Sequence, residues 1–185
     1  MIEVKLGDIS RLANRVDAIV NAANTALIPG GGVDGALNQA AGPKLKQAMA
    51  KIGGTPTGTA VITPAFDLPA KYVIHAVGPR YIDGQHEEET LLYSAYEAVF
   101  QLARENDIQT LAVPVLSAGI YQYPKEAAAR VLYNVANRVE NQRIATQVIV
   151  FDDVWLEIFK KIKRDSKDES CLLYTSPSPR DRSLS

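Results

Sequence analysis

The sequence contains very little cysteine and histidine. Cys171 is the only cysteine among 185 residues, so the chain has neither a disulfide framework nor a cysteine-based zinc site. The two histidines, His75 and His86, fall in different expected elements and do not form a zinc pair. We therefore expect no metal site, and we assign the chain no cofactor.

Long apolar runs and net charge are also missing. No apolar run approaches the roughly 18 residues of a membrane-spanning helix, and no basic and apolar leader opens the chain. We expect a soluble, cytoplasmic, monomeric protein without a membrane partner. The formal net charge is −1, and residues 165–185 carry three basic and four acidic side chains, which leaves residues 1–164 neutral. A neutral body argues against nucleic acid as a partner but permits one anionic small molecule held by backbone amides.

What the sequence does contain is a regular alternation of strand and helix patterns. The expected strands are residues 2–6, 17–20, 58–63, 72–77, 110–116 and 147–151. The expected helices are residues 36–41, 44–51 and 87–105, one that Pro124 opens, and one from Asp152 or Asp153 to about Arg164. This alternation predicts an α/β protein, a three-layer α/β/α sandwich with a mixed, largely parallel six-stranded sheet.

Residues 165–185 differ from the rest of the chain. They have no hydrophobic period and contain two Ser-Pro steps, as a translated vector read-through would. We therefore place the domain at residues 1–164 and interpret 165–185 as a disordered or non-native tail, which we exclude from the fold.

The most informative stretch follows the second expected strand. Asn21 and Asn24 precede three consecutive glycines, 30–32, and Asp34 then stands at the start of an alanine-rich helix. Consecutive glycines indicate a sharp bend or a close approach of the backbone to another group. Carboxamides beside them can bind hydroxyls, and a carboxylate at a helix start can activate water. A plain turn with Asp34 as a capping acid is the alternative.

Two phosphate-binding motifs fit this stretch poorly. Glycines 30, 32 and 35 satisfy G-x-G-x-x-G, but about eight loop residues separate them from the strand, and no acid stands near Ile52. No Gly-Lys-Ser/Thr follows, which excludes a P-loop.

Four motifs, in this order, resemble those of a macrodomain of the MacroD type. They are Gly-Asp-Ile (7–9), Val-Asn-Ala-Ala-Asn (20–24) with Gly-Gly-Gly-Val-Asp-Gly (30–35), Pro-Ala-Lys-Tyr-Val-Ile-His-Ala-Val-Gly-Pro (69–79), and Leu-Ser-Ala-Gly-Ile-Tyr (116–121). That branch is associated with O-acetyl-ADP-ribose deacetylation and with mono-ADP-ribosyl hydrolysis. The resemblance covers residues 1 to about 164 and implies that ADP-ribose, ADP-ribosylated protein or O-acetyl-ADP-ribose is the partner.

The resemblance also implies a role for individual residues. Asp34 would activate the attacking water and Asn24 would bind the distal ribose, which makes these two the expected catalytic residues. Asp8, with the Ile9 backbone, and Phe151 would hold the adenine, while Tyr121 would pack on the distal sugar. The diphosphate would lie among the backbone amides of Gly32, Val33, Ser117, Ala118, Gly119 and Ile120. Such amides need no lysine, which suits a neutral chain.

Four positions depart from the family pattern. Asn38 stands in place of a histidine, Pro29 in place of a glycine, Ala118 in place of a threonine and Gln122 in place of a glycine. The Gln122 change affects how the loop closes over the distal ribose. It therefore concerns the rate of the reaction more than the identity of the ligand.

Other interpretations stay open. The chain is either a hydrolase or a reader module that binds ADP-ribose without chemistry, and a third possibility is a phosphate- or RNA-end-processing role. Among single residues, His75 is expected to be a hydrogen-bonded core histidine, and Asn21 is expected to tie down the loop backbone. The alternative for Asp8 is a turn cap, and the alternative for Phe151 is plain core.

Overall fold

The structure is a computed structural model that describes residues 2–175. Six strands form one sheet: β1 (Ile2–Leu6), β2 (Val16–Ala22), β3 (Ala60–Pro64), β4 (Ala70–Ala76), β5 (Thr110–Val113) and β6 (Ala145–Val150). The helices are α1 (Gly32–Ala41), α2 (Pro43–Ile52), α3 (Glu88–Glu105), α4 (Lys125–Ala136), the short 3₁₀ helix η1 (Val139–Asn141) and α5 (Asp153–Thr175).

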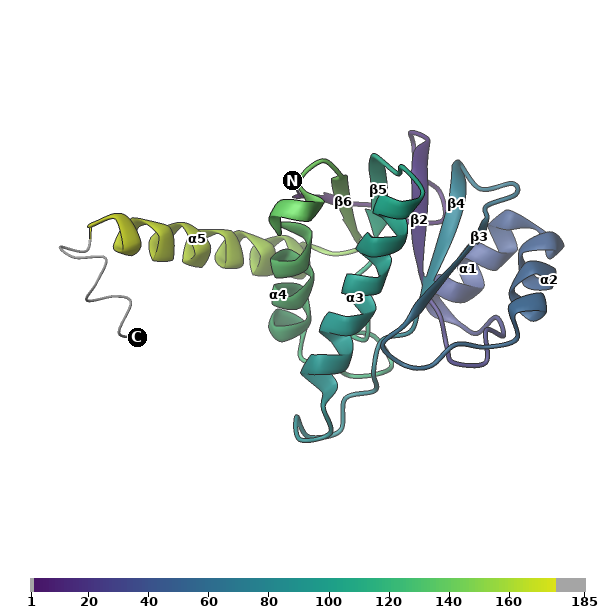
Figure 1. Ribbon diagram of the computed structural model, residues 1–185, viewed down its shortest axis with the longest axis horizontal. Helices are drawn as coiled ribbons and strands as arrows, with labels where there is room; N and C mark the ends of the chain where they lie inside the picture. Colours follow the sequence, from purple (N-terminus) through teal and green to yellow (C-terminus); the bar gives the residue numbers. More distant parts are fainter. Residues whose placement is uncertain (1, 176–185) are drawn as a thin grey trace.

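The strand order is β1-β6-β5-β2-β4-β3, and every neighbouring pair is parallel except β3 with β4. Helices α1 and α2 cover one face of the sheet, and α3, α4 and α5 lie on the other (Figure 1). The predicted three-layer sandwich with a mixed, largely parallel sheet is confirmed.

Alternation along β2 explains how one sheet serves two cores. Ala18 and Val20 pack with the helices α3 to α5, whereas Ile19 packs with α1 and α2. Successive side chains of a strand point to opposite faces, so apolar residues at every position are needed to fill both layers. Asn21 shares the face of Ile19 and therefore points toward the α1–α2 layer.

The ends of β5 and α5 each have a physical explanation. β5 ends at Val113, before the expected end at residue 116, because Pro114 has no N–H to continue the ladder. α5, in contrast, continues past the predicted end near Arg164 to Thr175. The Asp165 carboxylate accepts a 2.6 Å hydrogen bond from Arg130 of α4, so the helix is still packed on the domain at that point. The non-native origin of 165–185 stays a prediction, and residues 176–185 lie outside the described part of the chain.

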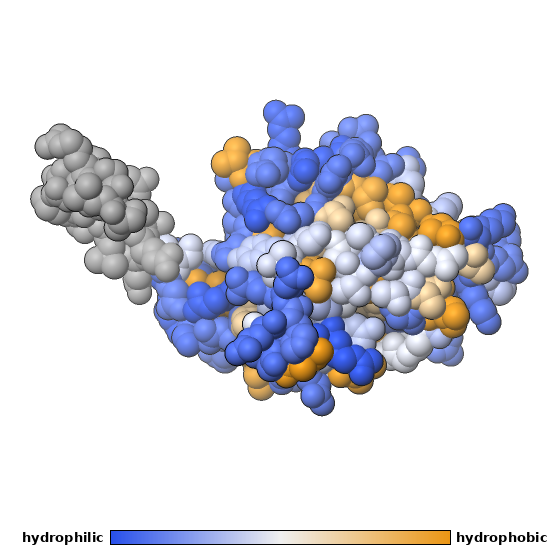
Figure 2. Space-filling view, turned by 60° about the horizontal axis from the view of Figure 1, so that its bottom comes forward, coloured by the Kyte–Doolittle hydropathy of each residue, from blue (hydrophilic) through white to orange (hydrophobic). Residues whose placement is uncertain are grey.

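The surface is polar over much of its area. Figure 2 shows hydrophilic residues over most of one face, with apolar residues gathered in several separate areas. Among residues 2–175, no helix combines the length and the apolar character that crossing a membrane requires.

The parallel strands place the loops that follow them at one edge of the sheet. Backbone hydrogen bonds join the ends of neighbouring strands there: Gly7 N–H donates to Val150, and Ala23 N–H donates to Ala76, each at 2.9 Å. Tyr81 N–H donates to the Tyr121 carbonyl at 2.9 Å, which links the loop after β4 to the loop after β5. This edge is where ligands bind in open α/β sheets.

Candidate functional site

The centre of the candidate site is the carboxylate of Asp34, in the first turn of α1. Its Oδ1 accepts hydrogen bonds from the side-chain Nδ2 of Asn21 at 2.9 Å and of Asn38 at 3.0 Å, and its Oδ2 accepts one from Gly30 N–H at 3.1 Å. Burial raises the pKa of the Asp34 carboxyl above its ordinary value, although the bonds from Asn21, Gly30 and Asn38 act in the opposite direction. The group is therefore a stronger base than an exposed aspartate.

Gly30 lies between Asp34 and Asn24, and because glycine has no side chain we call the space beside it the gap at Gly30. A Cβ at Gly30 would lie 3.9 Å from Asp34 Oδ2 and 3.8 Å from Asn24 Nδ2, and Gly30 itself is exposed. Oδ2 accepts only one hydrogen bond among the described residues, so a lone pair stays available on this side. A water molecule there would have both a carboxylate and a carboxamide within reach.

Asn24 also shapes the loop that carries it. Its Nδ2 donates to the Ile28 carbonyl at 2.7 Å, and its Oδ1 accepts from Ile28 N–H at 3.2 Å. Asn24 thus ties the loop backbone, the role that the sequence suggested for Asn21. Asn21 instead bonds to the side chains of Asp34 and His75. The first asparagine of the motif is buried and the second lies at the surface of the gap.

The loop after β5 presents a row of unused backbone donors. Among the described residues, no N–H from Ser117 to Tyr121 donates a hydrogen bond within the protein. The loop is held by other bonds, from Tyr123 N–H to the Ser117 carbonyl at 2.9 Å and from Gln122 N–H to the Gly119 carbonyl at 3.0 Å. Successive free N–H groups in a turn form an anion-binding concavity. Ser117 has a φ of +68°, a conformation that costs a non-glycine residue free energy and is typical of functional loops.

The start of α1 offers a second set of donors. Gly32 and Val33 are its first two residues, and their N–H groups have no partner one turn earlier in the helix. Gly32 has a φ of +58°, which glycine adopts without steric cost. Asp34 stands in this first turn, but no side chain caps the helix end, so the N–H groups of Gly32 and Val33 stay available to an anion.

Three of the predicted adenine-site residues follow β1 and β6, whose ends are hydrogen-bonded together. Asp8 Oδ1 accepts from the Ser10 hydroxyl at 2.6 Å and from Ser10 N–H at 2.9 Å, and the first of these bonds is the largest cause of the lowered pKa of Asp8. Asp8 is therefore a turn cap and is also ionised. The Ile9 side chain is buried, which leaves only its backbone for a ligand.

Phe151 is 82% exposed and Ile120 is 90% exposed. The interpretation of Phe151 as plain core is therefore wrong, because its ring packs against little of the protein. Large apolar side chains exposed beside a row of free amides are what a flat aromatic ligand would cover. Tyr121 is half-buried, and the Arg80 guanidinium lies 5.4 Å from its ring centroid.

The departures from the family pattern have distinct consequences. Asn38, one helical turn after Asp34, donates through Nδ2 to its Oδ1 and to its backbone carbonyl, each at 3.0 Å. Gln122 has a φ of +61°, which explains why glycine suits this position better. Pro29 and Ala118 are half-buried and make no hydrogen bond through their side chains. The role of Asn38 escaped the sequence analysis, although its spacing of four residues from Asp34 places both on one helix face.

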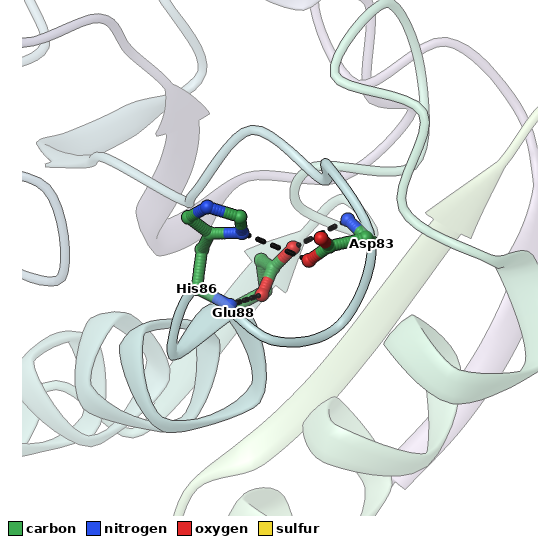
Figure 3. Close-up of side chains that lie close together, drawn as sticks. All are labelled: Asp83, His86 and Glu88. Atoms are coloured by element: carbon green, nitrogen blue, oxygen red, sulfur yellow. Dashed lines mark hydrogen bonds and ion pairs between the residues drawn. The ribbon is translucent and has the colours of Figure 1, made fainter.

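A second polar cluster joins Asp83 and His86, in the loop before α3, to Glu88, the first residue of that helix (Figure 3). Glu88 Oε2 accepts from the N–H groups of Ile82, Asp83 and Gly84 at 2.9 to 3.0 Å, and Oε1 accepts from His86 N–H at 2.6 Å. Burial acts to raise the pKa of Glu88, but these donors outweigh it and leave the pKa well below its usual value. The carboxylate is saturated with backbone donors, so the cluster builds the loop.

Comparison with known proteins agrees with the motifs. Residues 20–132 match the family model of the Macro domain. An O-acetyl-ADP-ribose deacetylase of Escherichia fergusonii is 42% identical over 175 residues, which cover 91% of this chain and 98% of that protein. The ADP-ribose glycohydrolase MACROD2 of Xenopus laevis is 48% identical over 163 residues, which cover 85% of this chain and 38% of that protein.

Solved structures give the same answer for the fold. The macrodomain of Oceanobacillus iheyensis, solved with ADP, superposes with a TM-score of 0.84 at 30% identity, covering 91% of this chain and 92% of that one. A Trypanosoma brucei macrodomain, in complex with ADP-ribose, gives a TM-score of 0.75 at 30% identity and covers 86% of this chain and 68% of that one. By sequence and by fold, the chain belongs to the macro domain family.

Proposed function

We propose that this macro domain protein is a hydrolase that binds ADP-ribose, removes mono-ADP-ribose from acidic side chains and deacetylates O-acetyl-ADP-ribose. The observation that carries the proposal is the buried carboxylate of Asp34, with its raised pKa, facing Asn24 across the gap at Gly30. Relatives of similar length that are 42% identical are named O-acetyl-ADP-ribose deacetylase, which supports the same reaction class. The cytoplasmic location and the monomeric state stay predictions.

In this proposal the two sets of free amides hold the diphosphate between them. Those of Gly32 and Val33 act from the start of α1, and those of Ser117 to Ile120 act from the loop after β5. Phe151 covers the adenine and Asp8 accepts its amino hydrogen through Oδ2. The distal ribose then lies at Asn24 and Tyr121. Backbone donors held rigidly in this way bind an anion without a basic side chain.

The reaction is hydrolysis of an ester. Asp34 Oδ2 accepts a proton from a water molecule while the water oxygen bonds to the ester carbon. The bond from that carbon to the leaving oxygen breaks, and the leaving group takes up a proton. For O-acetyl-ADP-ribose the products are acetate and ADP-ribose. General-base assistance of this kind contributes about 10²- to 10⁴-fold to the rate.

The proposal is tested with the wild type and Asp34→Ala on two substrates, O-acetyl-ADP-ribose and a protein carrying ester-linked mono-ADP-ribose. We expect the variant to lose about 10²- to 10⁴-fold in turnover. Its dissociation constant for ADP-ribose, measured by calorimetry, is expected to stay within a few-fold of the wild-type value. Equal turnover by both proteins would reject Asp34 as the base. Binding without turnover by the wild type would instead identify a reader module.

A further inference from the structure

A row of buried polar side chains runs behind Asp34, on the side away from the gap at Gly30. Asn21 of β2 and His75 of β4 are opposite each other in the parallel pairing of the two strands. Both side chains are fully buried, and Thr63 of β3 is 4% exposed. Asn21 Nδ2 lies 2.9 Å from Asp34 Oδ1 and 3.0 Å from His75 Nδ1, and His75 Nε2 lies 2.9 Å from Thr63 Oγ1.

The hydrogen bonds of this row have a defined direction. Asn21 Nδ2 carries two hydrogens and donates one to Asp34 Oδ1 and the other to His75 Nδ1, which must therefore be the unprotonated ring nitrogen. His75 Nε2–H then donates to Thr63 Oγ1, and the Thr63 hydroxyl donates to the Pro64 carbonyl at 3.1 Å. Burial lowers the pKa of His75 to about 4, so the ring stays neutral and Nδ1 stays an acceptor at neutral pH.

Only these two bonds fix the orientation of the Asn21 carboxamide. Its Oδ1 is buried and has no hydrogen-bond partner among the described residues. If His75 did not accept a hydrogen bond from Nδ2, the Asn21 carboxamide could rotate by half a turn without losing a hydrogen bond to His75. That rotation places Oδ1 against the Asp34 carboxylate, where two acceptors repel each other and the charged form of Asp34 is disfavoured.

We propose that His75 is a positioning residue for the reaction, which holds the Asn21 carboxamide as a donor to Asp34. The inference rests on the proposed function, since it concerns the orientation and the basicity of Asp34. Thr63 also contributes, because its hydroxyl accepts a hydrogen bond from His75 Nε2–H and so selects the ring tautomer that Asn21 requires. Asp34 and His75 are the titratable members of the row, whereas Asn21, Asn38 and Thr63 are neutral.

Two substitutions of His75 separate its two ring nitrogens. In His75→Asn the new side-chain oxygen takes nearly the place of Nδ1, so it still accepts from Asn21 but no longer reaches Thr63. In His75→Gln the side-chain nitrogen takes nearly the place of Nε2, so it still donates to Thr63 but offers Asn21 no acceptor at the position of Nδ1. Both variants are neutral, and each leaves one former partner of His75 and one end of the new carboxamide unpaired, which makes them matched controls for stability.

The experiment measures kcat for O-acetyl-ADP-ribose against pH, the dissociation constant of ADP-ribose and the melting temperature. We expect kcat of His75→Gln to fall roughly tenfold, the scale of one lost hydrogen bond to a charged group. Its acid limb shifts to higher pH, because Asp34 loses a donor. The affinity for ADP-ribose stays within about twofold in both variants, and His75→Asn keeps wild-type kcat within about threefold, less than the loss of one full hydrogen bond.

A folded His75→Gln with wild-type kcat and pH profile would overturn the inference, as would equal losses in both variants. Should neither variant fold, Thr63→Val decides, because it removes the acceptor of Nε2–H and permits the other tautomer. We then expect the same shift of the acid limb, and an unchanged profile overturns the proposal. Asp34→Ala in the same assay separates a failure of the proposed function from a failure of the role proposed for His75. If that variant retains turnover the proposed function fails, whereas an inactive Asp34→Ala beside an unaffected His75→Gln rejects only the role of His75.

Discussion

The sharpest test of the Asp34 loop is the substitution Gly35→Ala in the first turns of α1. An alanine Cβ at this position would lie 2.5 Å from the Gly30 carbonyl oxygen, where ordinary contacts begin at about 3.4 Å. The loop or the helix must therefore move by roughly 0.9 Å. A shift of Gly30 by this amount takes its N–H, now 3.1 Å from Asp34 Oδ2, out of hydrogen-bonding range.

Two free-energy effects oppose each other in this variant. Replacing glycine by alanine inside a helix stabilises a protein by about 1 kcal/mol when the space is open. Overpacking against a backbone atom costs about 1–3 kcal/mol. We therefore expect a net loss in the free energy of unfolding of up to about 2 kcal/mol, together with a fall in turnover, because Asp34 loses one of its three donors and the gap at Gly30 narrows.

The assays are urea denaturation at 25 °C and hydrolysis of O-acetyl-ADP-ribose. Gly31→Ala is the matched control, since a Cβ there meets no atom within 4 Å and φ is −88°. Because Gly31 is the N-cap of α1, where alanine is less favourable than glycine, we expect a loss of about 1 kcal/mol or less in the free energy of unfolding. A Gly35→Ala protein that is about 1 kcal/mol more stable than the wild type and equally active would refute the reasoning, because helix propensity alone would then govern the site.

Three further predictions concern the other parts of the site. A Cβ at Gly78 would lie 2.2 Å from Ser117 Oγ, which has no hydrogen-bond partner among the described residues. Gly78→Ala is therefore expected to weaken ADP-ribose binding in calorimetry. The double variant with Ser117→Ala is expected to recover part of the lost affinity. Phe151→Ala is expected to change the free energy of unfolding by less than about 0.5 kcal/mol but to cost about 1–3 kcal/mol of ADP-ribose affinity; equal affinity would remove Phe151 from the site. Because burial raises the pKa of Asp34, the folded protein binds the carboxyl proton more tightly than the unfolded chain does. Wild-type stability is therefore expected to fall relative to that of Asp34→Asn as pH rises from about 4 toward neutrality, by at most about 1.4 kcal/mol per pH unit. Denaturation midpoints of the two proteins that stay parallel from about pH 4 to pH 8 would contradict this.

The sequence predicts the architecture because its patterns are strong and local. Period-2 and fully apolar segments identify all six strands, although β5 ends at Val113 and not at the expected residue 116. The order of strands in the sheet and the antiparallel pairing of β3 are set by long-range contacts, which no local pattern encodes. The length of α5 was underestimated, because its polar residues after Arg164 show no period although they permit a helix.

The sequence predicts which residues form the candidate site but not the contacts between them. The glycines and Asp34 stand together in the sequence, and so their proximity needs no tertiary information. The bond between Asn21 and His75 joins residues 54 positions apart and depends on the register of β2 and β4. Without knowledge of that register, the sequence suggests that the Asn21 carboxamide bonds to the backbone of the adjacent loop. In the structure Asn24 makes those backbone bonds.

A crystal structure of this protein with ADP-ribose bound tests the central claim most directly. The account predicts that the diphosphate lies between the N–H groups of Gly32 and Val33 and those of Ser117 to Ile120, with the distal ribose at the gap between Asn24 and Asp34. A diphosphate held elsewhere, or a distal ribose turned away from the Asp34 carboxylate, would contradict it.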